Sequence, residues 1–122
     1  MKVLLSIKPE FALKIFDGSK RYEYRFTIFK GGEVKTVVVY ASEPIKQVIG
    51  EFEIGEIFHE EPEAVWVKIG DHAGITKKRF LQYFDNKTEG YAIEAKEART
   101  YDTPILLSEL MVQWPPQSFA YL

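Results

Sequence analysis

Two long segments with alternating side chains constrain the fold of this chain more than any other feature. The first, QVIGEFEIGEIF, covers residues 47–58 and contains Gly50 and Gly55. The second, YAIEAKEARTY, covers residues 91–101. Alternation with a period of two predicts strands with one buried face, and glycines inside a strand mark bulges or bends. Long strands that bend are what a small barrel requires.

Shorter elements are predicted before and between these two segments. Residues 9–17 predict a helix that has Pro9 in its first turn and Gly18 as its C-cap. The other predicted elements are buried strands at 3–7 and 36–41, a strand at 20–27, a turn at 30–33, a helix from Pro62 to Trp66, a helix after Thr76 as N-cap and a loop at 86–90. Long strands with short helices between them predict an α+β fold built on a small, partly open β-barrel.

The length of 122 residues fits one domain, and no repeat or low-complexity linker divides the chain. We therefore expect a single domain over residues 1–122. The chain has no cysteine, which excludes a disulfide framework and a thiolate zinc site. No apolar run approaches the ~20 residues that span a bilayer. These features predict a soluble, cytoplasmic protein that does not associate with a membrane.

Metal and cofactor chemistry has little support in the sequence. His59 and His72 are far apart, and neither has a further ligand at the spacing of a metal site. The chain contains neither a phosphate-binding loop nor a nucleophile elbow. We expect no metal and no cofactor, and no pattern predicts an oligomeric state.

The charge balance argues against a generic polyanion binder, because the net charge is -2. The charges are unevenly placed, however. Residues 1–30 hold seven basic and three acidic side chains, and residues 66–88 hold five and two. A fold that joins these two basic segments would create one face able to bind a polyanion. Arg79 lies in a charged run of the second segment, which predicts either a solvated helix face or part of such a track.

The stretch GSKRYEYR, residues 18–25, concentrates Lys20, Arg21, Glu23 and Arg25 within a strand-like pattern. One interpretation is a solvated edge strand with a ladder of ion pairs worth little in stability. The other is an anion site in which Glu23 holds neighbouring cations in place and leaves donors free. Both interpretations remain open on the residues alone.

Lys8 precedes Pro9 at the start of the first predicted helix, where backbone N–H groups and the helix dipole favour an anion. An ordinary solvated lysine is the alternative. Ser6, Lys8, Lys20 and Arg25 together form a better anion-binding candidate than any one of them alone.

Several motifs occur in an order that resembles the ASCH domain family of the PUA-like superfamily. They are SIKP (6–9), G-x-K-x-x-E-x-R (18–25), VYAS-x-P (39–44), IGEFE (49–53), GYAIEA (90–95) and PPQSF (115–119). The resemblance implies a PUA-like, partly open β-barrel with short helices flanking a cleft that binds RNA or a modified nucleotide. It also implies a setting in RNA metabolism or transcription-related regulation.

The resemblance places Lys20, Glu23 and Arg25 on the family's signature positions and Tyr40 and Ser42 at the cleft. Tyr40 would stack on a base and Ser42 would donate a hydrogen bond to it. The alternatives are a core aromatic residue for Tyr40 and a turn cap for Ser42.

Some members of the family that the chain resembles are hydrolases. The resemblance therefore implies an alternative function, in which the chain is a small amidohydrolase or a ribonuclease that acts on nucleosides or RNA through Lys20 and Glu23. Lys20 matches the lysine of the amidohydrolase branch, but Glu23 stands where that branch has threonine, so a threonine-nucleophile mechanism is lost. A Lys20–Glu23 acid–base pair remains open. A protein-interaction domain in a regulatory system is a third hypothesis.

The C-terminal QWPPQSFAYL combines three aromatic residues with two prolines. We expect Trp114, Phe119 and Tyr121 to dock on the barrel. The alternative is that Gln117 and Ser118 form a rim of the cleft.

Overall fold

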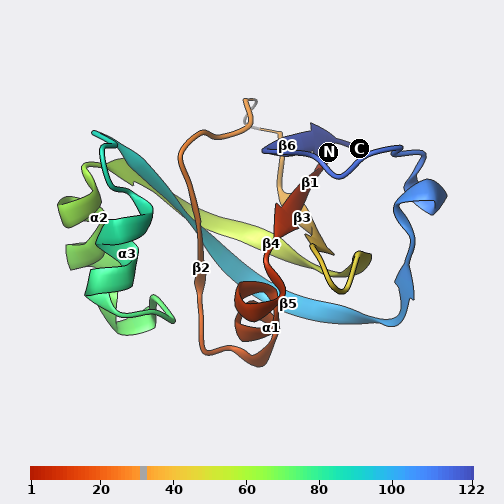
Figure 1. The fold of residues 1–122 in the computed structure, drawn as a ribbon, viewed down its shortest axis with the longest axis horizontal. Helices are drawn as coiled ribbons and strands as arrows, with labels where there is room; N and C mark the ends of the chain where they lie inside the picture. The colour runs from red at the N-terminus through yellow and green to blue at the C-terminus, as the bar shows by residue number, and fades with distance from the viewer. Residues whose placement is uncertain (31–32) are drawn as a thin grey trace.

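A six-stranded, mixed sheet dominates the computed structural model, which describes residues 1–30 and 33–122 (Figure 1). Its order is β2-β5-β4-β3-β1-β6. The strands are β1 (Lys2–Ile7), β2 (Tyr22–Arg25), β3 (Thr36–Ala41), β4 (Gln47–Glu60), β5 (Gly90–Ile105) and β6 (Phe119–Tyr121). The helices are α1 (Pro9–Asp17), α2 (Pro62–Ile69) and α3 (Lys77–Tyr83), with short 3-10 turns η1 (Gly70–His72) and η2 (Leu107–Leu110). β1 pairs with β3 in parallel, and the other pairings are antiparallel.

The two long alternating segments form β4 and β5, which cross the molecule side by side (Figure 1). Their pairing shifts register at three places, between Val48 and Gly50, between Glu51 and Glu53, and between Ile54 and Ile57. A Cβ at Gly50 would collide with the Arg99 carbonyl, so this position of the bend requires glycine. The prediction of a bent strand pair is confirmed, and the sheet curls into the expected partly open barrel of an α+β fold.

Most of the other predicted elements are confirmed as well. The helix over residues 9–17 and the strand over 36–41 have the predicted bounds. Thr76 caps α3, since its hydroxyl oxygen accepts from the Arg79 backbone N–H at 3.2 Å. The predicted turn at 30–33 contains Gly31 and Gly32, which lie outside the described residues.

Three predictions need correction. The strand predicted over residues 20–27 is only four residues long, because pairing with β5 begins at Tyr22 and ends at Arg25. The helix that begins at Pro62 continues to Ile69, because Val65 and Ile69 share its buried face. Trp114 does not dock on the barrel and is 77% exposed, whereas Phe119 pairs with β1 within β6.

The buried residues form separate clusters on the faces of the sheet. One cluster lies between α1 and the strands, and includes Val3, Ile15 and Phe52. A second lies beneath α2 and α3, where Phe80 and Tyr24 meet edge to face. The helices α1 and α3 pack over these two clusters and lie on either side of β2 (Figure 1). The candidate site lies between them. No helix among the described residues is long and apolar enough to cross a membrane.

Candidate functional site

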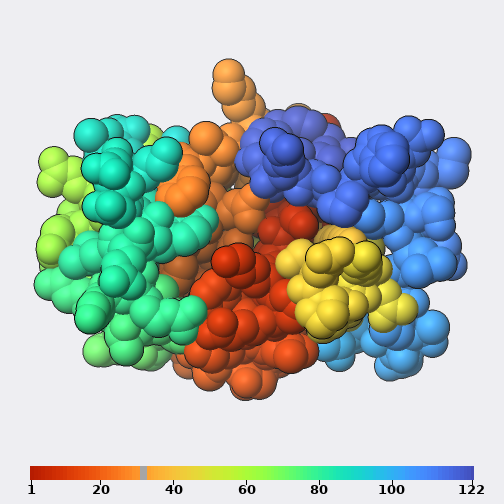
Figure 2. Space-filling view, in the orientation of Figure 1, coloured from red at the N-terminus to blue at the C-terminus, as the bar shows by residue number. Residues whose placement is uncertain are grey.

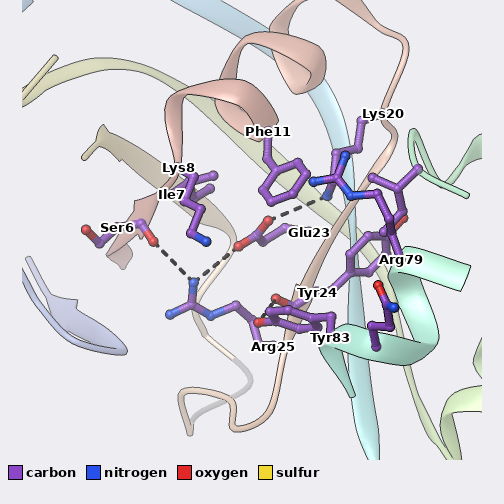
Figure 3. A pocket seen from close by; sticks show the side chains of 12 residues that line it. Ser6, Ile7, Lys8, Phe11, Lys20, Glu23, Tyr24, Arg25, Arg79 and Tyr83 are labelled. Atoms are coloured by element: carbon purple, nitrogen blue, oxygen red, sulfur yellow. Dashed lines mark hydrogen bonds and ion pairs between the residues drawn. The ribbon is translucent and has the colours of Figure 1, made fainter. Parts of the chain in front are cut away.

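A pocket of about 400 Å³ opens where α1, β2 and α3 meet (Figures 2 and 3). Its lining residues come from three parts of the chain. They are Ser6, Ile7, Lys8 and Phe11 from the end of β1 and the start of α1, Lys20 with Glu23, Tyr24 and Arg25 from the turn before β2 and β2 itself, and Ile75, Arg79, Gln82 and Tyr83 from α3 and the loop before it. Four of these side chains are cationic and one is a carboxylate. Both basic segments of the sequence therefore contribute to one concave surface.

Lys20 reaches the floor of the pocket because the chain turns sharply after α1. Gly18 ends the helix in the left-handed region with φ 87°, and the Lys20 backbone N–H donates to the Lys14 carbonyl at 3.1 Å. The Lys20 side chain then passes beneath Gly74, whose φ is +73°. A Cβ at Gly74 would lie 2.5 Å from the Lys20 Cβ, so only glycine permits this packing. As a result Lys20 is 1% exposed.

The loop that covers Lys20 is fastened by donors from the surrounding elements. Lys14 Nζ donates to the Gly74 carbonyl at 3.1 Å, and the Arg21 backbone N–H donates to the His72 carbonyl at 3.0 Å. The Tyr24 hydroxyl donates to the Ala73 carbonyl. The loop between η1 and α3 is therefore part of the pocket's structure.

Glu23 connects two cations in the pocket (Figure 3). Its Oε1 lies 3.6 Å from Lys20 Nζ, and its Oε2 lies 3.2 Å from Arg25 Nη1. Glu23 is 6% exposed, so these ion pairs are largely shielded from water. The interpretation of a solvated ion-pair ladder is therefore wrong for Lys20 and Glu23, although β2 is an edge strand.

Arg25 joins three separate parts of the chain. Its guanidinium donates to the Ser6 carbonyl at 3.3 Å, to Glu23, and to the Ser118 carbonyl. A guanidinium has five N–H donors, so these bonds do not exhaust its capacity. The Ser118 contact also ties the C-terminal segment to Arg25, and the Ser118 hydroxyl lies 3.1 Å from that of Thr27.

Aromatic rings form the walls around Lys20. Its Nζ lies 3.9 Å from the centroid of the Tyr24 ring and 5.6 Å from that of Phe11. The same ammonium donates to the Tyr22 carbonyl. The Tyr83 hydroxyl donates to the Tyr24 carbonyl at 3.0 Å, which fixes the Tyr83 ring at the pocket wall.

Burial changes the acidity of these groups. Desolvation lowers the pKa of Lys20 to about 8, although the adjacent Glu23 carboxylate opposes this change. Desolvation raises the pKa of Tyr83 to about 12 and that of Tyr24 further. The two phenols therefore stay protonated and serve as hydrogen-bond donors, while Lys20 loses its charge as the pH rises through about 8.

The rim of the pocket carries two further cations. Lys8 is exposed at the N-cap of α1, as the sequence suggested. Arg79 projects from α3, lies 5.5 Å from the Phe11 ring centroid, and pairs with Glu10 Oε1 at 2.9 Å. This pair joins α3 to α1, which lie next to each other at the surface (Figure 2). Arg79 thus belongs to the site and is not only part of a solvated helix face.

Tyr40 and Ser42 are the predicted site residues that do not line the pocket. Tyr40 is buried in a third cluster with Leu4, Val38 and Val48. The Ser42 carbonyl accepts from the Ile45 backbone N–H at 3.1 Å in the turn after β3. The placement of Tyr40 matches the alternative of a core aromatic residue. The other predicted residues, Ser6, Lys8, Lys20, Glu23 and Arg25, come together in the pocket.

Arg79 was one alternative at the sequence level, whereas Tyr24, Gln82 and Tyr83 of the pocket lining were not predicted. Arg79, Gln82 and Tyr83 are three and four residues apart, so they share one face of a helix. That spacing was visible in the sequence, but nothing local indicated which partner this face meets. Among residues 1–30 and 33–122, no three His, Asp or Glu side chains are grouped so that they could hold a metal ion.

The curled sheet and its pocket define this molecule as an α+β domain of the PUA-like, ASCH type. The crystal structure of ASCH from Zymomonas mobilis superposes with a TM-score of 0.89, at 27% identity over 99% of this chain and 87% of that chain. The chain belongs to the family described as "Domain of unknown function (DUF365)", whose model matches residues 2–113.

Two similar proteins come from Zymomonas mobilis and Ureaplasma parvum. An "ASCH domain-containing ribonuclease" of Zymomonas mobilis is 27% identical over 125 residues, which are 99% of this chain and 84% of that protein. The large ribosomal subunit protein uL22 of Ureaplasma parvum is 28% identical over 120 residues. This match covers 98% of the present chain but spans only 39% of the length of that relative.

Proposed function

We propose that the protein binds single-stranded RNA and takes one nucleotide, standard or modified, into the pocket between α1, β2 and α3. One observation carries this proposal: the pocket combines a buried, pre-oriented chain of charges, Lys20–Glu23–Arg25, with aromatic walls. Phosphate and base edges need charged donors and acceptors, and a base needs a ring to stack on. The proposal places the protein in the cytoplasm, in RNA metabolism or transcription-related regulation.

The size and charge of the pocket support a single nucleotide. A volume of about 400 Å³ lies within the range of small-molecule sites. Lys8 and Arg79 at the rim would neutralise phosphate, while Glu23 would accept a hydrogen bond from a base amino group. A long duplex has no separate base to offer such a pocket, so single strands and flipped nucleotides are the expected ligands. The ASCH domain-containing ribonuclease relative, which covers nearly the whole chain, supports RNA as the polymer.

Titration of fluorescently labelled single-stranded RNA at two salt concentrations tests the proposal. We expect saturable binding that weakens with salt, and weaker binding for Lys8→Ala. Lys35→Ala is the matched control, because Lys35 is also an exposed lysine but lies away from the pocket. Lys35 precedes β3 and Lys8 follows β1, and since these two strands are parallel, the two lysines lie at opposite ends of the strand pair. Absence of saturable binding at low salt to single-stranded and structured RNA would reject the proposal, and so would equal losses in the two variants.

A second candidate function is RNA cleavage at the same pocket. It is favoured by the Lys20–Glu23 pair, in which burial brings the pKa of Lys20 to about 8, close to the range where a side chain transfers protons efficiently. Glu23 would act as base and Lys20 as acid or charge stabiliser. Incubation with RNA and, for the amidohydrolase alternative, with acetylated cytidine tests this candidate. Turnover that survives both Lys20→Ala and Glu23→Ala would assign the activity to another site or to a contaminant.

A further inference from the structure

An exposed pair of aromatic rings continues the pocket wall outward. Phe26 and Tyr83 stack with a centroid distance of 4.6 Å and an interplanar angle of 19°. Phe26 is 41% exposed and Tyr83 is 40% exposed, although both are large apolar side chains. Tyr83 lines the pocket and Phe26 does not, so the pair extends from the pocket wall to the surface beyond it.

The pair is held firmly despite its exposure. The Tyr83 hydroxyl donates to the Tyr24 carbonyl at 3.0 Å, and Phe26 meets the edge of Phe84 at 5.6 Å. A ring that is already fixed loses little conformational freedom when a second ring stacks on it. This arrangement therefore suits recognition better than a mobile surface aromatic residue would.

A cation accompanies the exposed ring. Lys87 Nζ lies 4.9 Å from the centroid of Phe26. Aromatic rings beside flexible cations are the combination with which proteins bind consecutive nucleotides of a single strand, because the ring stacks on a base and the cation neutralises its phosphate. The lysine side chain is long and flexible, so it can leave the ring face and turn to a phosphate.

We propose that Phe26, with Tyr83 behind it and Lys87 beside it, is a stacking site for a second nucleotide, next to the one in the pocket. This inference rests on the proposed function, since it assumes that RNA enters the pocket. Tyr83 lines the pocket, and the centroid of its ring lies 4.6 Å from that of Phe26, so Phe26 lies one ring beyond the pocket wall. The neighbour of a nucleotide held in the pocket is therefore within reach of Phe26.

Oligonucleotides of defined length test this site on the unaltered protein. The probes are the four nucleoside monophosphates, dinucleotides, and dinucleotides in which an abasic residue replaces the base at the 5′ or the 3′ position. We expect at least one dinucleotide to bind about tenfold more tightly than its monophosphate. An abasic residue at one of the two positions should remove this gain. Monophosphates that bind while no dinucleotide binds more tightly would overturn the second site and leave the proposed function standing.

Variants locate the effect. Phe26→Leu keeps an apolar side chain against Phe84 but removes the ring, and should abolish the dinucleotide gain without changing monophosphate affinity. Trp114→Leu is the matched control, because Trp114 is an exposed aromatic residue outside the pocket lining. Lys87→Ala leaves the rings in place and should weaken dinucleotide binding and flatten its salt dependence. This variant tests the site even if Phe26→Leu does not fold. Unchanged dinucleotide binding in Phe26→Leu and Lys87→Ala would overturn the inference, and failure of every probe to bind would reject the proposed function with it.

Discussion

Replacing Lys20 with methionine should remove a specific pH dependence of stability. Methionine has a similar length and flexibility without the charge, so it can occupy the channel beneath Gly74 and beside Tyr24. The pKa of Lys20 in the folded protein is about 8, whereas its ordinary value is 10.5, because the folded protein shields the ammonium from water. The unfolded chain therefore retains this proton to higher pH than the folded chain does.

The direction of the effect follows from this difference. Below pH 8 both states carry the proton, and the free energy of unfolding does not depend on pH through Lys20. Between about pH 8 and 10.5 the unfolded state binds more protons, so stability rises with pH. Each pKa unit corresponds to 1.36 kcal/mol, so the full rise is about 3 kcal/mol at most. This stabilisation is complete above the unfolded pKa and is lost as the pH falls through the folded pKa.

Urea denaturation at pH 7, 8, 9 and 10 measures the contribution of Lys20 to the free energy of unfolding, as the difference between the unaltered protein and Lys20→Met. The unaltered protein should gain stability relative to Lys20→Met as the pH rises from 8 to 10, by about 2 kcal/mol over that interval. Lys35→Met, which removes an exposed lysine, controls for the general effect of losing a charge. Parallel stability curves for the unaltered protein and Lys20→Met would refute the placement of Lys20 as a buried, weakly basic amine.

Four further predictions follow from the same contacts. Arg25→Ala should destabilise the fold by about 2 kcal/mol in urea denaturation, since two partly buried carbonyls and the Glu23 carboxylate lose their donor, and should reduce the salt slope of RNA binding by about one. Glu23→Gln should keep or increase polyanion affinity in salt titrations but reduce discrimination among nucleotides, because the two cations are no longer held. Gly74→Ala should lower the melting temperature and weaken RNA binding together, because its Cβ collides with Lys20. Thr76→Ala should cost about 1 kcal/mol in urea denaturation through loss of the α3 cap, and RNA affinity should stay unchanged.

Local patterns in the sequence were sufficient for most of the fold. Pro9 and Gly18 mark the ends of α1 because both act through backbone geometry within one turn. The alternation in β4 and β5, and the glycine at their bend, likewise reflect neighbouring residues. The shortened β2 was missed because the ends of a strand depend on its partner, and β5 is formed by residues about seventy positions later.

The site was predictable only in part, for a related reason. The grouping of Lys20, Glu23 and Arg25 followed from one strand and the turn before it. The burial of Lys20 did not, because it depends on Gly74 and on a loop fastened by Tyr24 and Lys14. These contacts join residues far apart in the chain, and no local pattern encodes them.

The cost of burying charge gives the strongest physical reason to assign binding to this pocket. Removing Lys20 and Glu23 from water is expensive, and their mutual attraction repays that cost only in part, so a buried ion pair is weak evidence for stability. A folding role alone would be served at least as well by apolar side chains of similar volume. A ligand phosphate or base edge, in contrast, gains from donors and acceptors that are already oriented and desolvated, because it avoids the cost of ordering them. Lys20→Met separates the two roles. If this variant keeps its stability at pH 7 and loses RNA affinity, the buried charge serves binding. If the variant unfolds while its residual folded fraction binds RNA normally, the buried charge serves the fold.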